Sequence, residues 1–129
     1  KTIELMEKYK TYKKLNKNGK YLISQWKKLS LKYNLNLQVN EMPCICSFNF
    51  KKNNNLLKTF ITKEMLKKGY LASNMLYVSI YHDKQTIDKY IKNLEFILKK
   101  IKLISNNKKE ILKKLSKVTT KTSFKRLIN

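Results

Sequence analysis

The sequence is poor in the residues that most metal, disulfide and phosphate sites require. It has two cysteines, two glycines, one proline and one histidine in 129 residues. Two glycines are too few for a glycine-rich phosphate loop, and Cys44, Cys46 and His82 together fall one ligand short of a structural zinc site. The two cysteines stand two apart on a predicted strand, where geometry for a disulfide is poor. We therefore expect two small, buried thiols in a protein of the reducing cytoplasm.

Acidic residues and long apolar runs are also scarce. No apolar run approaches the roughly 18 residues that cross a bilayer, so we predict no membrane span. The 8 acidic residues are scattered and do not pair for acid–base chemistry. A general base at His82 would need an orienting partner, which the adjacent Asp83 cannot readily supply. The sequence predicts no catalytic residue and no metal site, and we interpret His82 as a turn residue.

The charge balance is strongly basic, with 30 Lys and Arg against 8 Asp and Glu and a formal net charge of +22. Such a charge is typical of proteins that bind polyanions. Only Arg126 is an arginine, however, whereas proteins that read bases or clamp phosphates use arginine for its bidentate fork. An excess of lysine is also what an A+T-rich genome produces. We predict no specific nucleic-acid partner, and a basic module for nucleic acid or anionic membrane is the alternative hypothesis.

Hydrophobic periodicity predicts an α+β domain, with helices and about three half-buried strands in a small antiparallel sheet. Four stretches have helical spacing: 1–17, 20–33, 56–68 and 86–103. Asn16, Asn18 and Gly19 break the pattern between the first two helices, and Trp26 is a core anchor of the second. From residue 104 onward we expect a basic extension or linker, with a short helix over 110–118 and a tail over 119–129.

Three stretches alternate like half-buried strands: 35–39, 44–50 and 70–80. The segment Glu41 to Pro43 is a turn or bulge between the first two, because proline cannot donate to a central ladder. Gly69 is placed as a helix C-cap before the third strand, and Asp83 as the N-cap of the helix that follows it. Leu71, Met75, Tyr77 and Ser79 are predicted to share one face of that third strand.

The order of these segments resembles the carboxy-terminal small domain of class III aminotransferases, in particular the glutamate-1-semialdehyde aminomutases. The strongest match is KEMLKKGYLA at 63–72, which looks like the family's segment EML-x-x-G followed by a hydrophobic residue and LA. SIYHD at 79–83 and TIDKY at 86–90 look like the family's next segment. Softer matches precede them in the same order: GKYL at 19–22, NLNL at 34–37 and SFNF at 47–50. The resemblance covers about residues 1–103.

The resemblance implies a fold type I enzyme that uses pyridoxal phosphate (PLP). This chain would be its small domain, a small antiparallel sheet of about three strands with helices packed on one face, and would be inactive alone. The family's cofactor lysine and phosphate-binding residues lie in a large amino-terminal domain, so no cofactor-binding or catalytic residue carries over. The implied partners are that large PLP-binding domain, a homodimeric parent enzyme and a small-molecule amino donor or acceptor. The small domain caps the active-site cleft, and the expected cleft residues are Asn74, Met75, Tyr77 and Ser79. Neither the substrate nor the choice between aminotransferase and aminomutase is assigned.

Overall fold

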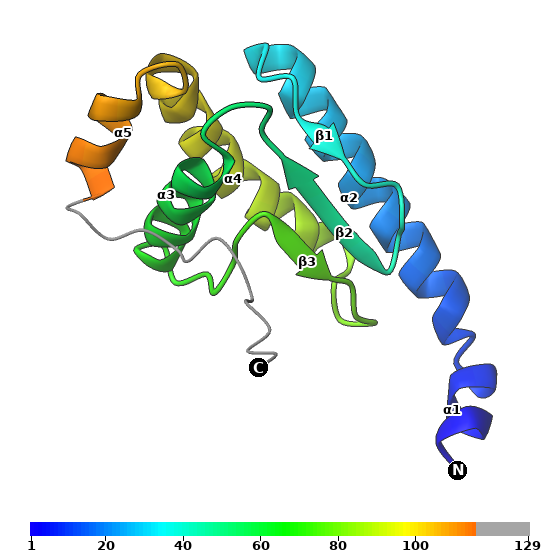
Figure 1. Ribbon diagram of the computed structural model, residues 1–129. Helices are drawn as coiled ribbons and strands as arrows, with labels where there is room; N and C mark the ends of the chain where they lie inside the picture. The colour runs from blue at the N-terminus through cyan, green and yellow to red at the C-terminus, as the bar shows by residue number, and fades with distance from the viewer. Residues whose placement is uncertain (116–129) are drawn as a thin grey trace, which may run out of the picture.

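The computed structural model describes residues 1–115, which form an α+β fold with the sheet packed against helices (Figure 1). The helices and strands follow one another in the order α1 (Thr2–Lys8), α2 (Thr11–Tyr33), β1 (Gln38–Val39), β2 (Ile45–Asn49), α3 (Asn54–Leu66), β3 (Met75–Tyr77), α4 (Lys84–Ile104) and α5 (Lys108–Leu115). The predicted tail over 119–129 lies outside the described residues.

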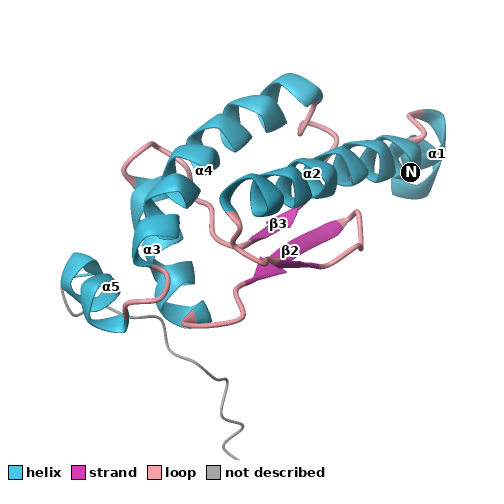
Figure 2. Cartoon of the chain, turned by 90° about the horizontal axis from the view of Figure 1, so that it is seen from above, coloured by secondary structure: helices cyan, strands magenta, loops and turns pink. Residues whose placement is uncertain are grey.

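The three strands form an antiparallel sheet in the order β1-β2-β3. Val39 pairs with Phe48 across β1 and β2, and Cys46 pairs with Leu76 across β2 and β3. Figure 2 shows α2 and α4 on one side of β2 and β3, and no described element covering the other side. The predicted sheet with helices on one face is thus confirmed.

The core lies between the sheet and these helices. Alternation in β2 directs Cys46 and Phe48 toward the helices, and both side chains are fully buried. Trp26 of α2 meets Phe48 edge-on with ring centroids 4.9 Å apart, and its side chain has no exposed surface. The role of Trp26 as a core anchor is confirmed. Helix α4 adds the longest apolar stripe to this core. Its buried residues are Ile87, Tyr90, Ile91, Leu94, Ile97, Leu98, Ile101 and Ile104.

The predicted helix break at Asn16 to Gly19 is wrong. Helix α2 runs unbroken from Thr11, and the chain instead turns at Lys10, which has the left-handed φ of 48°. Gly19 is a helical residue because α2 passes against the turn before β2 at this point. A β-carbon at Gly19 would lie 2.7 Å from Pro43 Cα and closer still to the Pro43 carbonyl. The glycine therefore marks a close contact between distant segments and not a local stop.

Two of the predicted strands are shorter than expected. The first is reduced to two residues because Asn36 has a φ of 49°, which is outside the β region. The third spans Met75–Tyr77 where 70–80 was predicted, since the chain turns into the sheet only after Ser73 and leaves it at Val78. The prediction that Cys44 is buried is wrong: β2 begins at Ile45, and Cys44 is exposed in the turn.

The predicted caps around the third strand are confirmed. Gly69 follows α3 with a φ of 79°, and the Tyr70 N–H next to it donates to the Met65 carbonyl at 3.0 Å, which closes the last turn of the helix. The Asp83 carboxylate accepts a hydrogen bond from the Thr86 N–H at 2.8 Å, as an N-cap does. Both caps fix the directions in which β3 enters and leaves the sheet.

The ends of the described chain behave differently from each other. Helix α5 buries Ile111 and Leu115 in the same core, against α3 and α4, so the stretch predicted as an extension begins with a docked helix. Helix α1 buries no residue, and its Ile3 and Met6 side chains are exposed. In Figure 1 it projects from the domain at the start of α2.

Candidate functional site: an uncharged open face of the sheet

The side of the sheet that no described helix covers carries an uncharged surface. Register and alternation place six side chains on it: Gln38, Ile45, Ser47, Asn49, Met75 and Tyr77. None is charged, although 29% of the sequence is. The apolar members are accessible, with Met75 45% and Tyr77 66% exposed. We call these six residues the open face.

The loops that border the open face are equally poor in charge. Residues 70–82 contain no Asp, Glu, Lys or Arg, and residues 34–50 contain only Glu41. Leu71 and Tyr81 extend the exposed apolar surface beyond the strand. Contiguous exposed apolar surface of this kind marks interaction sites in soluble proteins, because water otherwise penalises it. In a chain with a net charge of +22, a surface without lysine is the exception.

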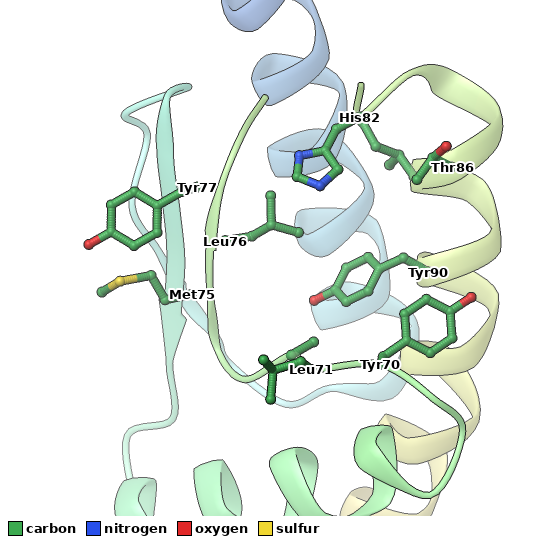
Figure 3. Close-up of a pocket in the computed structure, with 10 residues that line it drawn as sticks. Tyr70, Leu71, Met75, Leu76, Tyr77, His82, Thr86 and Tyr90 are labelled. Carbon is green, nitrogen blue, oxygen red and sulfur yellow. The ribbon is translucent and has the colours of Figure 1, made fainter. Parts of the chain in front are cut away.

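A pocket of about 320 Å³ lies beside β3, between the strand and α4. Figure 3 shows Leu76 pointing toward Tyr90 and His82, on the opposite side of the strand from Met75 and Tyr77. The other lining residues are Tyr70, Leu71, Ala72, Met75, Tyr77, Thr86 and Ile87. Asp, Glu, Lys and Arg are absent from this lining, so the pocket suits an apolar group.

Two of the polar side chains of this pocket, His82 and Tyr70, make hydrogen bonds, whereas the buried Tyr90 hydroxyl has no hydrogen-bond partner among the described residues. His82 Nδ1 accepts from the Ser79 N–H at 2.9 Å, so a neutral imidazole carries its proton on Nε2. This bond places His82 in the turn, as expected from the sequence. Burial raises the pKa of Tyr90, whose hydroxyl stays neutral and is no candidate for a base. The Tyr70 hydroxyl accepts a hydrogen bond from Asn93 at 3.3 Å.

The four expected cleft residues occupy three different environments. Met75 and Tyr77 lie on the open face. Asn74 is 5% exposed, and its side-chain amide donates to the Phe48 carbonyl at 2.7 Å, so it ties β3 to β2 instead of facing the open side. Ser79 lies in the turn after β3, where its hydroxyl accepts from the Tyr81 N–H at 3.3 Å.

Sequence reasoning assigned no functional role to Ile45, Ser47 and Asn49, which complete the open face from β2. Their alternation with Cys46 and Phe48 was visible, and it predicted that they share a face. The signal that would have marked the face as a site is the scarcity of charge over 34–50 and 70–82 together, where Glu41 is the one charged residue. These two stretches meet only in the tertiary structure, where β2 pairs with β3.

Five of the eight carboxylates in the described residues form ion pairs, namely Glu4, Glu41, Glu64, Asp88 and Glu95. Glu64 lies between Lys67 at 2.6 Å and Lys100 at 2.8 Å, and these lysines hold its pKa below the ordinary value against the opposing effect of burial. Lys84, the largest influence, likewise lowers the pKa of Asp88. Within residues 1–115, no cluster of His, Cys, Asp and Glu could hold a metal ion.

The described residues do not fit a PLP site. A cofactor lysine must be desolvated or otherwise activated so that its amine is neutral and nucleophilic. The polar residues buried in the described part of the chain are Ser30, Thr59 and Asn74, and no lysine is among them. In the described part of the chain, a hydrogen bond to Glu95 raises the pKa of Lys32, and a hydrogen bond to Asp88 raises the pKa of Lys84. No described lysine therefore has the environment that such a role requires.

Comparison of the chain with protein families, with characterised proteins and with solved structures found no match. Within the part of the chain that the structure describes, none of the helices combines the length and the apolar character that crossing a bilayer requires. The fold and the open face are therefore the observations on which a function can be proposed.

Proposed function

We propose that residues 1–103 form the small domain of a class III, fold type I PLP-dependent enzyme, an aminotransferase or an aminomutase similar to the glutamate-1-semialdehyde aminomutases. The observation that carries the proposal is the uncharged open face with Met75 and Tyr77 exposed on it. A small domain that caps a cleft needs one face free of its own helices, and contact with another domain favours an apolar, uncharged surface. The three-stranded sheet with helices on one side supports the same proposal.

In this proposal the chain contributes the cover of the cleft, and the large domain contributes the cofactor and its lysine. Met75 and Tyr77 would face the cleft, limit the entry of a small-molecule amino donor or acceptor, and exclude water from it. Ser79 would lie at the rim, where the turn with His82 leads into α4. Asn74 would act indirectly, because it holds β3 in register with β2.

Treatment of the isolated chain with PLP and then borohydride tests whether the cofactor lysine lies outside this chain. We expect low, scattered labelling over many exposed lysines, because no described lysine is buried. Peptide mapping by mass spectrometry measures the distribution. Stoichiometric labelling of a single lysine would contradict the proposal, since it would place the cofactor lysine in this chain.

A chimera gives the positive test. Residues 1–115, which include the docked helix α5, replace the small domain of a glutamate-1-semialdehyde aminomutase, and the expected product is a soluble dimer that retains bound PLP. Introducing Met75→Lys and Tyr77→Lys should prevent this assembly, because two ammonium groups would be buried without partners. Leu103→Lys is the matched control, since Leu103 is exposed on α4 and is not part of the open face. Equal behaviour of the two variants would contradict the role of the open face.

The alternative, a basic module for nucleic acid or anionic membrane, is motivated by the net charge of +22. It predicts tight binding to a DNA duplex or to phosphatidylserine vesicles with a steep salt dependence and a few dominant lysines. Our leading proposal predicts only weak binding that disappears near physiological ionic strength, about 0.15 M. Titrations at several salt concentrations separate the two, and tight binding at that ionic strength would favour the alternative.

A further inference from the structure

Strand β3 is an edge strand with main-chain groups free on its outer side. Among the described strands it pairs with β2 alone. The Phe48 N–H donates to the Asn74 carbonyl and the Val78 N–H donates to the Cys44 carbonyl, each at 3.0 Å. In an antiparallel ladder these bonds alternate along the strand. The N–H and C=O groups of Met75 and Tyr77 therefore point away from β2.

This edge is short, but it lacks two other features by which proteins protect a sheet edge. Charged side chains, proline and covering elements commonly prevent a further strand from pairing there. Residues 70–82 contain neither a charged residue nor a proline. The side chains around the edge are highly accessible, with Leu71 95% and Tyr81 81% exposed. An exposed, uncharged edge of this kind can take a further strand by main-chain pairing.

The pocket between β3 and α4 lies beside the same edge (Figure 3). Side chains of an added strand alternate between the two faces of the sheet. Residues opposite Met75 and Tyr77 would bond to their main-chain groups and point toward the open face. The residue between them, opposite Leu76, would point toward Tyr90 and Ile87, where the pocket has room for an apolar side chain.

We propose that the edge of β3 binds an extended segment of a partner polypeptide as a fourth strand. The segment is uncharged at its centre, with one apolar side chain in the pocket, and acidic at its ends. Charge decides the class of occupant: the pocket lining carries no ionic charge, whereas the chain as a whole carries a net charge of +22. Acidic residues flanking an apolar centre complement this arrangement. A second copy of the chain does not, because two chains of this net charge repel each other.

This proposal concerns the edge of the sheet and does not rest on the proposed enzyme family. The probe is the peptide acetyl-Glu-Thr-Val-Phe-Val-Thr-Glu-amide, whose phenylalanine would enter the pocket. We expect saturable binding in which the Met75 and Tyr77 amide signals shift in NMR spectra and their hydrogen exchange slows. The control peptide has both valines N-methylated, which removes the donors that would meet β3, and we expect its binding to be lost.

The variant Tyr77→Pro tests whether the peptide pairs with the main chain of β3. The Tyr77 N–H points away from β2, so proline leaves the β2–β3 ladder intact while it removes one donor of the edge. We expect about a tenfold loss of peptide affinity, the upper range for one hydrogen bond. Tyr77→Ala is the control, because it keeps the N–H and should keep most of the affinity.

Three results would overturn the proposal. The first is absence of peptide binding to the unaltered chain, and the second is binding that the N-methylated peptide reproduces. The third is a concentration-dependent dimer of the unaltered chain that Tyr77→Pro converts to a monomer, because the edge would then pair with a second copy. None of these results would bear on the open face, whose test is the chimera with Met75 and Tyr77 replaced.

Discussion

Replacement of Gly19 by alanine is expected to destabilise the domain, although alanine is the better helix former. Gly19 is buried in the middle of α2, opposite the turn that precedes β2. A methyl group there would lie 2.7 Å from Pro43 Cα and closer to the Pro43 carbonyl, whereas real β-carbons keep at least 3.0 Å from such atoms. Both opposing atoms belong to the main chain, so no side-chain rotation can relieve the contact.

The net effect follows from two opposing contributions. In an exposed helix, alanine in place of glycine stabilises by about 1 kcal/mol. Overpacking of a rigid contact costs about 1–3 kcal/mol and occasionally more. The turn would have to move away from α2 together with Cys46, whose Sγ lies 3.2 Å from the Pro43 oxygen. Because the opposing atoms are main chain, we take the upper end of this cost, about 3 kcal/mol, less the gain of about 1 kcal/mol. We therefore expect Gly19→Ala to lower the free energy of unfolding by about 2 kcal/mol, which corresponds to a Tm lower by roughly 6–10 °C.

Urea unfolding monitored by tryptophan fluorescence measures this effect. Trp26 is the single tryptophan and is fully buried, so its emission reports the loss of the core. Gly69→Ala is the control: Gly69 has a φ of 79° but no atom within 4 Å of an added β-carbon, so only the backbone strain of about 1 kcal/mol is expected. A Gly19→Ala variant as stable as the unaltered chain, or more stable, would refute the reasoning.

Three further substitutions or treatments test individual residues. Asn74→Ala should lower the free energy of unfolding in urea by about 1–3 kcal/mol, because it leaves buried polar groups unpaired. Met75→Ala on the open face should lower it by less than about 0.5 kcal/mol. Equal losses in the two variants would contradict the structural role of Asn74. Asp83→Ala should lower the Tm by a few degrees at neutral pH. The hydrogen bond from the Thr86 N–H lowers the pKa of Asp83 below 3.8 in the folded chain. The stabilisation by the Asp83 carboxylate is therefore present above pH 3.8 and is lost as the pH falls through the folded-state pKa. Thermal melts at several pH values should show the Tm of Asp83→Ala and of the unaltered chain converging in acid. Iodoacetamide should alkylate Cys44 in the native chain but Cys46 only after unfolding, because burial raises the Cys46 pKa to about 11. Mass spectrometry measures the labelling of each cysteine, and equal labelling of the two in the native chain would contradict this prediction.

The helices and caps could be predicted because their signals lie within a few residues of one another. The stripe of α4 repeats with helical spacing, and Asp83 stands directly before the residues whose amides it caps. The cap at Gly69 could be predicted from the position of this glycine just after the end of α3. The half-buried character of β2 followed from the alternation of its residues, with Cys46 and Phe48 buried between less buried neighbours.

The errors arose where contacts between distant segments overrode local preference. Gly19 had the local signature of a helix stop, but its neighbour is Pro43, and only the fold brings the two together. That Asn74 lies at a cleft with Met75 and Tyr77 stays a prediction. The fold directs its side chain to the Phe48 carbonyl, a partner that is distant in the sequence.

The sequence by itself determined the fold class, the caps around β3, and the two stretches poor in charge, because periodicity, capping and composition are properties of neighbouring residues. Tertiary structure decided that these two stretches join in one open face, that no other described strand pairs with the outer edge of β3, and that a pocket lies beside it. The physical reason is that strand pairing and close packing depend on which distant segments meet. Hydrogen bonds such as that from Phe48 to Asn74 exist only once the chain has folded.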